Sequence, residues 1–344
     1  MQTIPSELPA LLLAWYAQGH RALPWREDRE PYHVWLSEIM LQQTRVEAVR
    51  GYYARFLAEL PDIASLAACP PDRLHKLWEG LGYYSRVRNL QKAAQWIVSE
   101  HQGVFPRDFD AIRALSGVGD YTAGAIASIC FDMPTPAVDG NVLRVLSRVL
   151  ADPTPIDRPQ TKKEAAERLR AVYPAGHCGD FTQSLMELGA VVCVPNGAPH
   201  CETCPLRALC LAHARGCARE LPCKSAKKPR KVEQKTVFLL RCGDTYAVRR
   251  RSAQGLLAGL WELPNVEGHL SPQQALDCAA QWGAAPRELV RQLEKRHIFT
   301  HIEWELRGYE IVCANADARF VWADQARFDR DVALPTAFRQ FLTE

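Results

Sequence analysis

The sequence predicts two domains of different class, an all-α domain followed by a smaller α+β domain. Three observations lead to this prediction. The chain has 344 residues, which is long for a single domain. Residues 1–215 show one helical pattern after another, with breaks rich in Pro, Gly and Asp. A polar, basic stretch with two prolines follows, and after it the pattern changes to strands. We therefore place a linker at 216–234 and the second domain at 235–344.

The helices of the first domain are predicted from the spacing of their apolar residues. The clearest repeat, which ends at Pro61, has the 3-4-3 spacing of a helix and consists of Val46, Val49, Tyr53, Phe56, Leu57 and Leu60. Further helices are predicted at residues 86–100, 122–131, 141–150, 162–173 and 181–192.

The second domain is predicted to combine a hairpin, a helix and further strands. Residues 235–251 are typical of a β-hairpin with its turn at 242–244. A helix follows, with Ser271 as N-cap and Pro272 at its first position. Strands are predicted at residues 296–312 and 318–324.

Composition limits the classes of protein that the chain can belong to. It is 47% hydrophobic and 24% charged, as in globular proteins. No apolar run approaches the ~20 residues of a membrane helix, and the first 20 residues lack the pattern of a secretory signal. We expect a cytoplasmic protein, associated with the nucleoid if the source is bacterial. The net charge of +3 permits a nucleic-acid partner without indicating one.

Four of the twelve cysteines form a dense cluster at residues 193–210, "CVPNGAPHCETCPLRALC". Cys193, Cys201, Cys204 and Cys210 have the spacing C-x7-C-x2-C-x5-C. Four thiolates on one short loop suit a zinc ion or a [4Fe–4S] cluster. Zinc sites more often use two separated C-x2-C pairs, so the spacing favours iron–sulfur and leaves zinc open. Cys217 and Cys223 follow closely and complicate the choice of the fourth ligand.

The segment "LSGVG", residues 115–119, predicts a tight turn that leads into a helix. Gly117, Val118 and Gly119 would expose backbone N–H groups there, where a phosphate oxygen can bind. Such a helix-hairpin-helix turn holds DNA by its backbone and reads no sequence. A plain turn between two helices is the simpler interpretation of these residues alone.

Two carboxylates have both a structural and a catalytic interpretation. Asp139 precedes an apolar helix in "VDGNV", where it would serve as an N-cap. Glu38 lies in "WLSEIMLQQT", where we expect a carboxylate in the first turn of a helix, favoured by the helix dipole. Neither pattern indicates catalysis by itself.

Six motifs in order carry a resemblance to a known family. They are "WLSEIMLQQT", "GLGYYSRVRNL", "LSGVGDYTAGAI", "VDGNV", "ELGAVVC" and the four-cysteine loop. This set resembles the MutY-type adenine DNA glycosylases, a branch of the endonuclease III helix-hairpin-helix superfamily. The resemblance is strong over residues 1 to about 225. It departs from the family pattern in having seven residues, where six are usual, between the first two cysteines.

The resemblance implies the residues that break the N-glycosidic bond. Glu38 would give a proton to adenine N7, and Asp139 would stabilise the cationic sugar, as paired carboxylates do in glycoside hydrolysis. Tyr121 stands where bifunctional relatives carry the lysine that forms a Schiff base with the sugar. No lysine lies between Lys92 and Lys162. We therefore expect removal of the base without strong lyase activity.

The resemblance also implies contacts to DNA and to a cofactor. The adenine must leave the helix stack. Gln43 and Tyr83 match residues that wedge into the duplex, and Arg26 and Glu187 match contacts to the extruded base. Cys193, Cys201, Cys204 and Cys210 would hold a [4Fe–4S] cluster.

The C-terminal domain resembles the Nudix-like domain of the same family, best at "GLLAGLWELP". A Nudix hydrolase needs a run of glutamates for its metal-bound substrate, and no such run follows Pro264. Recognition is therefore more plausible than hydrolysis. Phe299, Thr300 and His301 match the family's Phe-Ser-His loop, which inspects 8-oxoguanine.

These observations predict a monomeric glycosylase that acts on double-stranded DNA with adenine opposite 8-oxoguanine or guanine. Two alternatives remain. Tyr121 and the C-terminal extension disfavour a bifunctional pyrimidine glycosylase of the endonuclease III type. The paired carboxylates disfavour a DNA-damage binding protein without catalysis.

Overall fold

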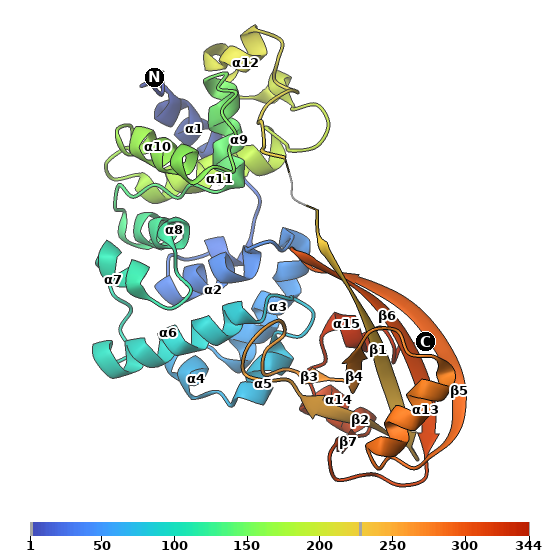
Figure 1. The fold of residues 1–344 in the computed structure, drawn as a ribbon. Coiled ribbons are helices and arrows are strands. Elements are labelled where there is room, and N and C mark those ends of the chain that lie inside the picture. Colours follow the sequence, from blue (N-terminus) through green and yellow to red (C-terminus); the bar gives the residue numbers. More distant parts are fainter. Residues whose placement is uncertain (1–2, 227–228, 344) are drawn as a thin grey trace. The chain divides into compact units, whose positions relative to one another are not determined.

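The computed structural model describes residues 3–226 and 229–343. Contacts within the chain divide it into two units, which are residues 1–68 with 88–226, and residues 69–87 with 227–344. The first unit is helical and the second contains the β-sheet (Figure 1). The fold is thus an all-α part and a smaller α+β part, and the predicted fold class is confirmed.

Most of the first unit consists of short helices joined by turns. Its elements are α1 (Leu8–Gln18), η1 (Pro24–Arg26), α2 (Pro31–Leu41), α3 (Val46–Glu59), α4 (Ile63–Ala68), α6 (Ser85–His101, which begins in the second unit), α7 (Phe109–Ala114), α8 (Asp120–Phe131), α9 (Gly140–Val149), α10 (Pro159–Arg170), α11 (Cys178–Val191), η2 (Cys201–Thr203), η3 (Arg207–Leu209) and α12 (Leu211–Ala214). All six helices predicted from apolar spacing are present, as α3, α6 and α8–α11.

Helices α1, α9 and α11 enclose one core of the first unit, with Leu8, Leu12, Val142, Phe181 and Leu185 among its buried residues (Figure 1). Helices α9 and α11 approach closely because α11 carries a glycine there. A Cβ on Gly189 would lie 2.7 Å from the Cβ of Asn141, closer than real Cβ atoms pack. This approach sets the start of α9 beside α11.

The second unit is built on a mixed sheet of seven strands. In order β3-β2-β1-β6-β5, β1 and β6 are parallel and the other neighbours are antiparallel, while β4 pairs with β1 and β7 with β2. Its elements are α5 (Pro71–Leu77), β1 (Lys231–Cys242), β2 (Thr245–Arg250), β3 (Trp261–Glu262), β4 (Asn265–Glu267), α13 (Pro272–Gln281), β5 (Pro286–Ile298), β6 (Ile302–Cys313), β7 (Val321–Ala323), α14 (Gln325–Arg330) and α15 (Thr336–Arg339).

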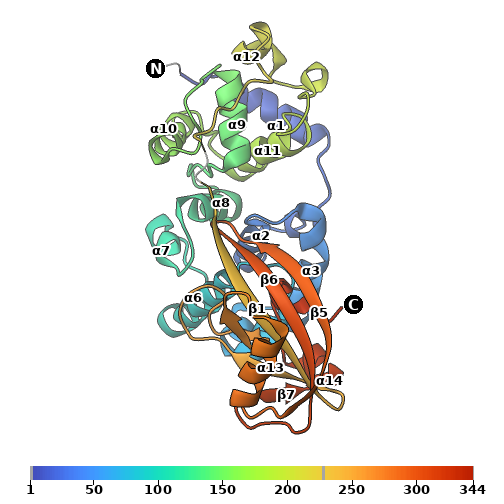
Figure 2. The ribbon, with the colours of Figure 1, turned by 45° about the vertical axis from the view of Figure 1, so that its right-hand side comes forward.

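Alternate residues of β1 point to opposite faces of the sheet, as the strand period requires. Val237 and Leu239 belong to a core that includes Phe338 of α15. Phe238 and Leu240 belong to another core, formed with small residues of α13 such as Ala275. Helices therefore cover both faces, and Figure 2 shows α13 lying against the long strands β1, β6 and β5.

The predicted hairpin and the predicted capped helix of the second unit are confirmed, whereas residues 296–312 contain the end of β5, a turn and most of β6 instead of one strand. Cys242 pairs with Thr245, so the hairpin turns at Gly243 and Asp244. Ser271 caps α13 in a capping box with Gln274. Strand β1 starts at residue 231, inside the predicted linker 216–234, of which residues 227–228 lie outside the described residues. Over the described parts of the chain, the helices are all too short or too polar to cross a membrane.

Candidate active site

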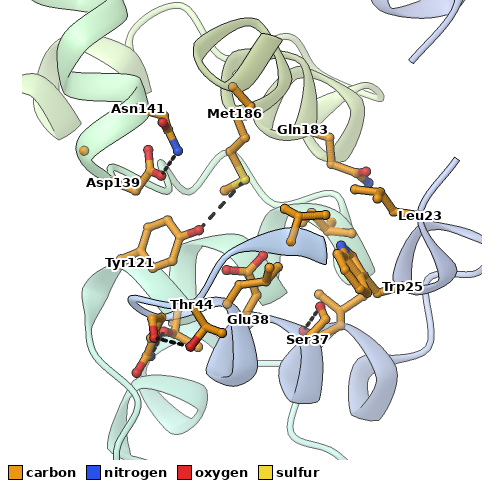
Figure 3. A pocket seen from close by; sticks show the side chains of 18 of the residues that line it. Leu23, Trp25, Ser37, Glu38, Thr44, Tyr121, Asp139, Asn141, Gln183 and Met186 are labelled. Carbon is orange, nitrogen blue, oxygen red and sulfur yellow. Dashed lines mark hydrogen bonds between the residues drawn. The ribbon is translucent and has the colours of Figure 1, made fainter. Parts of the chain in front are cut away.

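A cavity of about 620 Å³ lies in the first unit, lined by residues from α2, α8, α9, α10 and α11. Figure 3 shows labelled side chains from α2, α8, α9 and α11 lying around it. Six of the predicted site residues line this cavity, namely Arg26, Glu38, Gln43, Gly119, Tyr121 and Asp139. The fold therefore brings residues that are more than 100 positions apart in the sequence to one place.

Glu38 lies in the last turn of α2, so the expectation of a first-turn carboxylate was wrong. The helix begins seven residues earlier, at Pro31, which starts helices well because its N–H is not needed there. Glu38 is only 7% exposed. Burial raises the pKa of its carboxyl group to about 7, and the charge of Asp139 adds to the rise, while Tyr121 and Arg26 oppose it.

Asp139 is the N-cap of α9, as the sequence predicts. Its carboxylate accepts hydrogen bonds from the Val142 backbone N–H at 2.8 Å and from Asn141 Nδ2 at 2.7 Å. Burial raises the pKa of Asp139, while these two bonds and the charge of Arg144 act in the opposite direction. The donors around Asp139 thus favour its ionised form, and Glu38 has fewer of them.

Tyr121 lies in the first turn of α8, and its hydroxyl group points into the cavity (Figure 3). The hydroxyl is 3.9 Å from Met186 Sδ. Burial, followed by the negative charges of Glu38 and Asp139, raises the pKa of Tyr121 well above 10. The side chain is therefore a neutral hydroxyl donor at physiological pH.

Glu187 is 1% exposed and is held by two arginines. The Arg21 guanidinium group forms two bonds to it, at 2.8 and 2.9 Å, and the Arg21 backbone N–H forms a third at 3.2 Å, while Arg26 forms one at 2.9 Å. Burial alone would raise the pKa of Glu187, but the two guanidinium groups lower it to about 2. Arg26 lines the cavity and Glu187 supports it from behind. Sequence reasoning missed Arg21, which no local motif indicates.

Sequence reasoning also missed other lining residues, and four of them bear on the proposed chemistry. Asn141 and Met186 touch the predicted catalytic groups, and Gln183 accepts a hydrogen bond from Tyr16 at 2.9 Å. Lys162 of α10 also lines the cavity, so an amine does border the site. Only the "DGN" sequence gave a local indication, because an Asn two residues after an N-cap can bond back to it.

Gln43 and Tyr83, the predicted wedge residues, share an unusual backbone conformation. Their φ angles are 58° and 47°, in the left-handed region that non-glycine residues rarely adopt. Gln43 lines the cavity of the first unit, and Tyr83 belongs to the second unit. There the exposed Tyr83 hydroxyl lies 3.1 Å from Thr300 Oγ1.

Phe299, Thr300 and His301 lie in the tight turn between β5 and β6. The Phe299 N–H donates to the Ile302 carbonyl at 2.8 Å, which closes the turn. The Phe299 ring packs inward, 4.8 Å from the ring of Trp304. Thr300 and His301 are exposed, so two of the three predicted recognition residues are open to a ligand.

The hairpin at residues 115–119 has the geometry that its glycines predict. Gly117 has φ 79°, and a Cβ there would lie 2.7 Å from the Cβ of Asn89. Gly119 is the N-cap of α8, so free N–H groups follow it. The Val118 N–H donates to the Leu115 carbonyl at 3.0 Å and is used within the turn.

All four predicted cysteine ligands line one small cavity. Cys217 and Cys223 are not among the residues that line it, which separates them from the other four. Arg148 Nη1 lies 3.2 Å from Cys193 Sγ. The positive charge of this guanidinium group would stabilise a thiolate at Cys193. No group of three or more His, Cys, Asp or Glu in the described residues is arranged to hold one metal ion.

Comparison with known proteins identifies the family of the chain. Residues 36–173 match the model of the HhH-GPD superfamily of base excision DNA repair proteins, and residues 236–344 match a NUDIX domain. The chain is 38% identical to adenine DNA glycosylase of Mus musculus, over 89% of this chain and 71% of that protein. The Schizosaccharomyces pombe enzyme is 34% identical, over 85% and 78%.

The chain belongs to the adenine DNA glycosylase family. It is therefore a base excision repair enzyme that hydrolyses N-glycosyl bonds in DNA. A thermostable thymine-DNA glycosylase has a similar structure, with a TM-score of 0.56 and 28% identity over 60% of this chain and 95% of that one. Endonuclease III in a non-covalent DNA complex has a TM-score of 0.53 and 23% identity, over 62% of this chain and 98% of that one, and shares the fold.

Proposed function

We propose that this adenine DNA glycosylase removes adenine opposite 8-oxoguanine or guanine in double-stranded DNA and leaves the strand intact. The observation that carries the proposal is the joint placement of Glu38, Tyr121 and Asp139 around one cavity. A flipped-out base needs such a pocket, and cleavage of its bond to the sugar needs both an acid and a negative charge.

Glu38 is the proton donor in this proposal. Its pKa of about 7 keeps a large fraction of the carboxyl group protonated near neutral pH. The proton passes to N7 of adenine, so the base leaves as a neutral molecule while the bond to C1′ breaks. Burial also keeps bulk water away from Glu38. Exposure to water would return the pKa of this carboxyl group toward its usual, lower value.

Asp139 is the ionised partner that faces the developing positive charge on the sugar. Its bonds from Val142 and Asn141 fix the carboxylate before the substrate arrives, so little reorganisation is needed during the reaction. Water then adds at C1′ and gives up one proton, which restores the protonated form of Glu38 and completes hydrolysis. Arg26, held by Glu187, supports the extruded base from the opposite wall.

Tyr121 supports the monofunctional part of the proposal. Its neutral hydroxyl cannot form an imine with the sugar aldehyde, whereas an amine at this position would. Lys162 is the one lysine among the described lining residues, and its position on α10 differs from that of Tyr121 on α8. The monofunctional assignment can therefore be tested by measuring whether Lys162 forms an imine with the sugar aldehyde.

The four cysteines on residues 193–210 fit a [4Fe–4S] cluster better than a zinc ion. A single zinc needs four sulfur atoms about 2.3 Å from one point, whereas a cluster is bound through one thiolate on each of its four irons. The described cysteines line one cavity, and their C-x7-C-x2-C-x5-C spacing differs from the two separated C-x2-C pairs that are more usual for zinc. When bound, the cluster would hold this loop together, next to Arg148, and take no part in hydrolysis.

The second unit supports a recognition role. Helix α13, which follows the "GLLAGLWELP" motif, contains a single acidic residue, Asp277, where a Nudix hydrolase has several. Thr300 and His301 are exposed at the turn beside Tyr83. We assign to these two residues the polar contacts that distinguish 8-oxoguanine from guanine. We also propose that the protein acts as a monomer in the cytoplasm.

One experiment tests the function as a whole. The protein is incubated with duplexes that contain adenine opposite 8-oxoguanine, thymine glycol or uracil, and the products are resolved with and without alkali. We expect release of adenine, and strand breaks only after alkali. Activity on thymine glycol without activity on adenine would overturn the proposal in favour of a pyrimidine glycosylase.

A further inference from the structure

A buried carboxylate joins residues 69–87 to the C-terminal part of the second unit. Glu79, 8% exposed, accepts the Leu334 backbone N–H at 2.9 Å and Arg339 Nη1 at 2.8 Å. Lys76 Nζ lies 2.5 Å from the same carboxylate and donates to the Phe328 carbonyl at 2.6 Å. We call these five residues the Glu79 cluster.

The cluster joins parts of the chain about 250 residues apart, in an environment where such bonds are strong. A carboxylate that is shielded from water and bonded to two cations and an N–H loses all of these interactions if the two parts separate. The ion pair between Asp72 and Arg250 forms a second, more exposed link between the same parts.

Glu79 lies four residues before Tyr83, at the start of a turn that is held by side-chain hydrogen bonds. The turn contains Gly82, whose φ is 71°. Trp78 Nε1 donates to the Gly82 carbonyl at 3.1 Å, and Arg86 Nη2 donates to the Leu81 carbonyl at 3.0 Å. Because the turn is braced in this way, fixing Glu79 also fixes Tyr83, whose hydroxyl lies 3.1 Å from Thr300 Oγ1.

We propose that Glu79 is a positioning residue for the choice of opposite base. It holds the turn that carries Tyr83 against the segment 328–339, so that Tyr83 and the exposed residues Thr300 and His301 meet the DNA as one body. Contacts of Thr300 and His301 with the opposite base then favour insertion of Tyr83. The proposal rests on the function proposed above.

The test compares single-turnover adenine excision opposite 8-oxoguanine and opposite guanine in the full-length protein. Glu79→Ala should lower the ratio of the two rates about 10-fold, which is within the usual range of coupling between two sites. The decrease should come from slower excision opposite 8-oxoguanine. Glu79→Gln keeps an oxygen for the Leu334 N–H and should have a smaller effect. The ratio is taken within one protein sample, so a loss of folded protein cancels.

Glu310→Gln is the matched control. Glu310 is 9% exposed and pairs with Arg241 and Arg291 inside the sheet, away from residues 69–87. The ratio of the two excision rates in Glu310→Gln should equal that of the wild type. An unchanged ratio in Glu79→Ala, or an equal loss in Glu310→Gln, would overturn the proposal. If Glu79→Ala does not fold, Arg339→Ala replaces it with the same expected direction.

The failure of the underlying function is distinguishable from the failure of this inference. A wild-type protein that excises adenine equally well opposite both bases would refute lesion recognition itself, and the role of Glu79 with it. A wild-type preference that persists in both Glu79 variants would refute the positioning role alone.

Discussion

Glu38 and Asp139 line the same cavity but have different surroundings, and this difference supports the two roles that we propose for them. Asp139 accepts two hydrogen bonds at the start of α9, which favour a negative charge. Glu38 is buried in the last turn of α2, where desolvation favours the protonated form. We therefore propose Glu38 as the acid and Asp139 as the anion of the site.

Glu38→Gln should lower the single-turnover excision rate at least ~10²-fold, because Gln cannot give up a proton. In the wild type the rate should fall as the pH rises through about 7, where Glu38 loses its proton. The matched control is Glu47→Gln on the exposed surface of α3, which should excise normally. A wild-type rate that is flat from pH 6 to 9 would contradict the assignment.

The same substitution should stabilise the protein at high pH. The folded-state pKa of Glu38 lies above its value of 4.5 in the unfolded chain, so folding takes up a proton between these values. Stability is therefore lost as the pH rises from 4.5 to 7, by about 3 kcal/mol when the whole shift is counted. Glu38→Gln should melt at a higher temperature than the wild type at pH 8 and equally at pH 4.

Lys162 is the residue on which the monofunctional assignment can be tested. Borohydride should trap little protein on DNA, because Tyr121 stands where the bifunctional relatives of the resembled family carry a lysine. Any trapped adduct should arise through Lys162 Nζ, which condenses with the sugar aldehyde, loses water and is reduced by borohydride. Lys162→Ala should lower this trapping and Lys163→Ala should not. Efficient trapping that survives Lys162→Ala would contradict the prediction.

At the scale of elements, close packing of α9 on α11 positions the groups to which we assign catalytic roles. Gly189 leaves room for Asn141, which bonds Asp139, while Glu187 of the same helix holds Arg26. The cysteine loop at 193–210 follows α11 directly. Arg148 at the end of α9 contacts Cys193, so the loop is tied to both helices.

Cys201→Ala should remove the metal and weaken DNA binding or folding more than the chemical step. The reason is that a metal-linked loop contributes its binding energy to the fold. Iron content, visible absorbance and DNA affinity are measured, together with the single-turnover rate at saturating protein. Cys217→Ala is the control, since Cys217 does not line the same cavity. One zinc and no iron in the wild type would contradict the cluster assignment.

At the scale of the whole molecule, the chain does not divide at one point in the sequence. Residues 69–87 lie between helices of the first unit but make their contacts with residues 227–344. Removal of the C-terminal part would therefore also expose Glu79 and its neighbours. Point substitutions in the turn at 299–301 test recognition without this side effect.

His301→Ala should reduce the preference for 8-oxoguanine over guanine by about 5-fold to about 150-fold, as expected for the loss of one hydrogen bond worth ~1–3 kcal/mol. Thr300→Ser keeps the hydroxyl and should change little. Ile298→Ala, an exposed neighbour on β5, is the control for a general disturbance of the turn. The measurement is the ratio of adenine-excision rates opposite the two bases. An unchanged ratio in His301→Ala would remove that residue from recognition.

The sequence by itself determined the features that depend on neighbouring residues. Apolar spacing predicted helices such as α3, and capping chemistry predicted the roles of Asp139 and Ser271. The order of motifs identified the family and its candidate acid and anion. Each of these depends on residues within a few positions of one another, where backbone geometry limits the choices.

The tertiary structure alone decided which distant residues meet. Arg21 binds Glu187 across 166 positions, Lys162 borders the cavity from α10, and Glu79 bonds Leu334 across 255 positions. A single arginine, lysine or glutamate belongs to no periodic pattern, so its partner cannot be predicted from the sequence. Such pairs form because packing of the helices and the sheet brings buried charges together, where each needs a partner to offset its lost hydration.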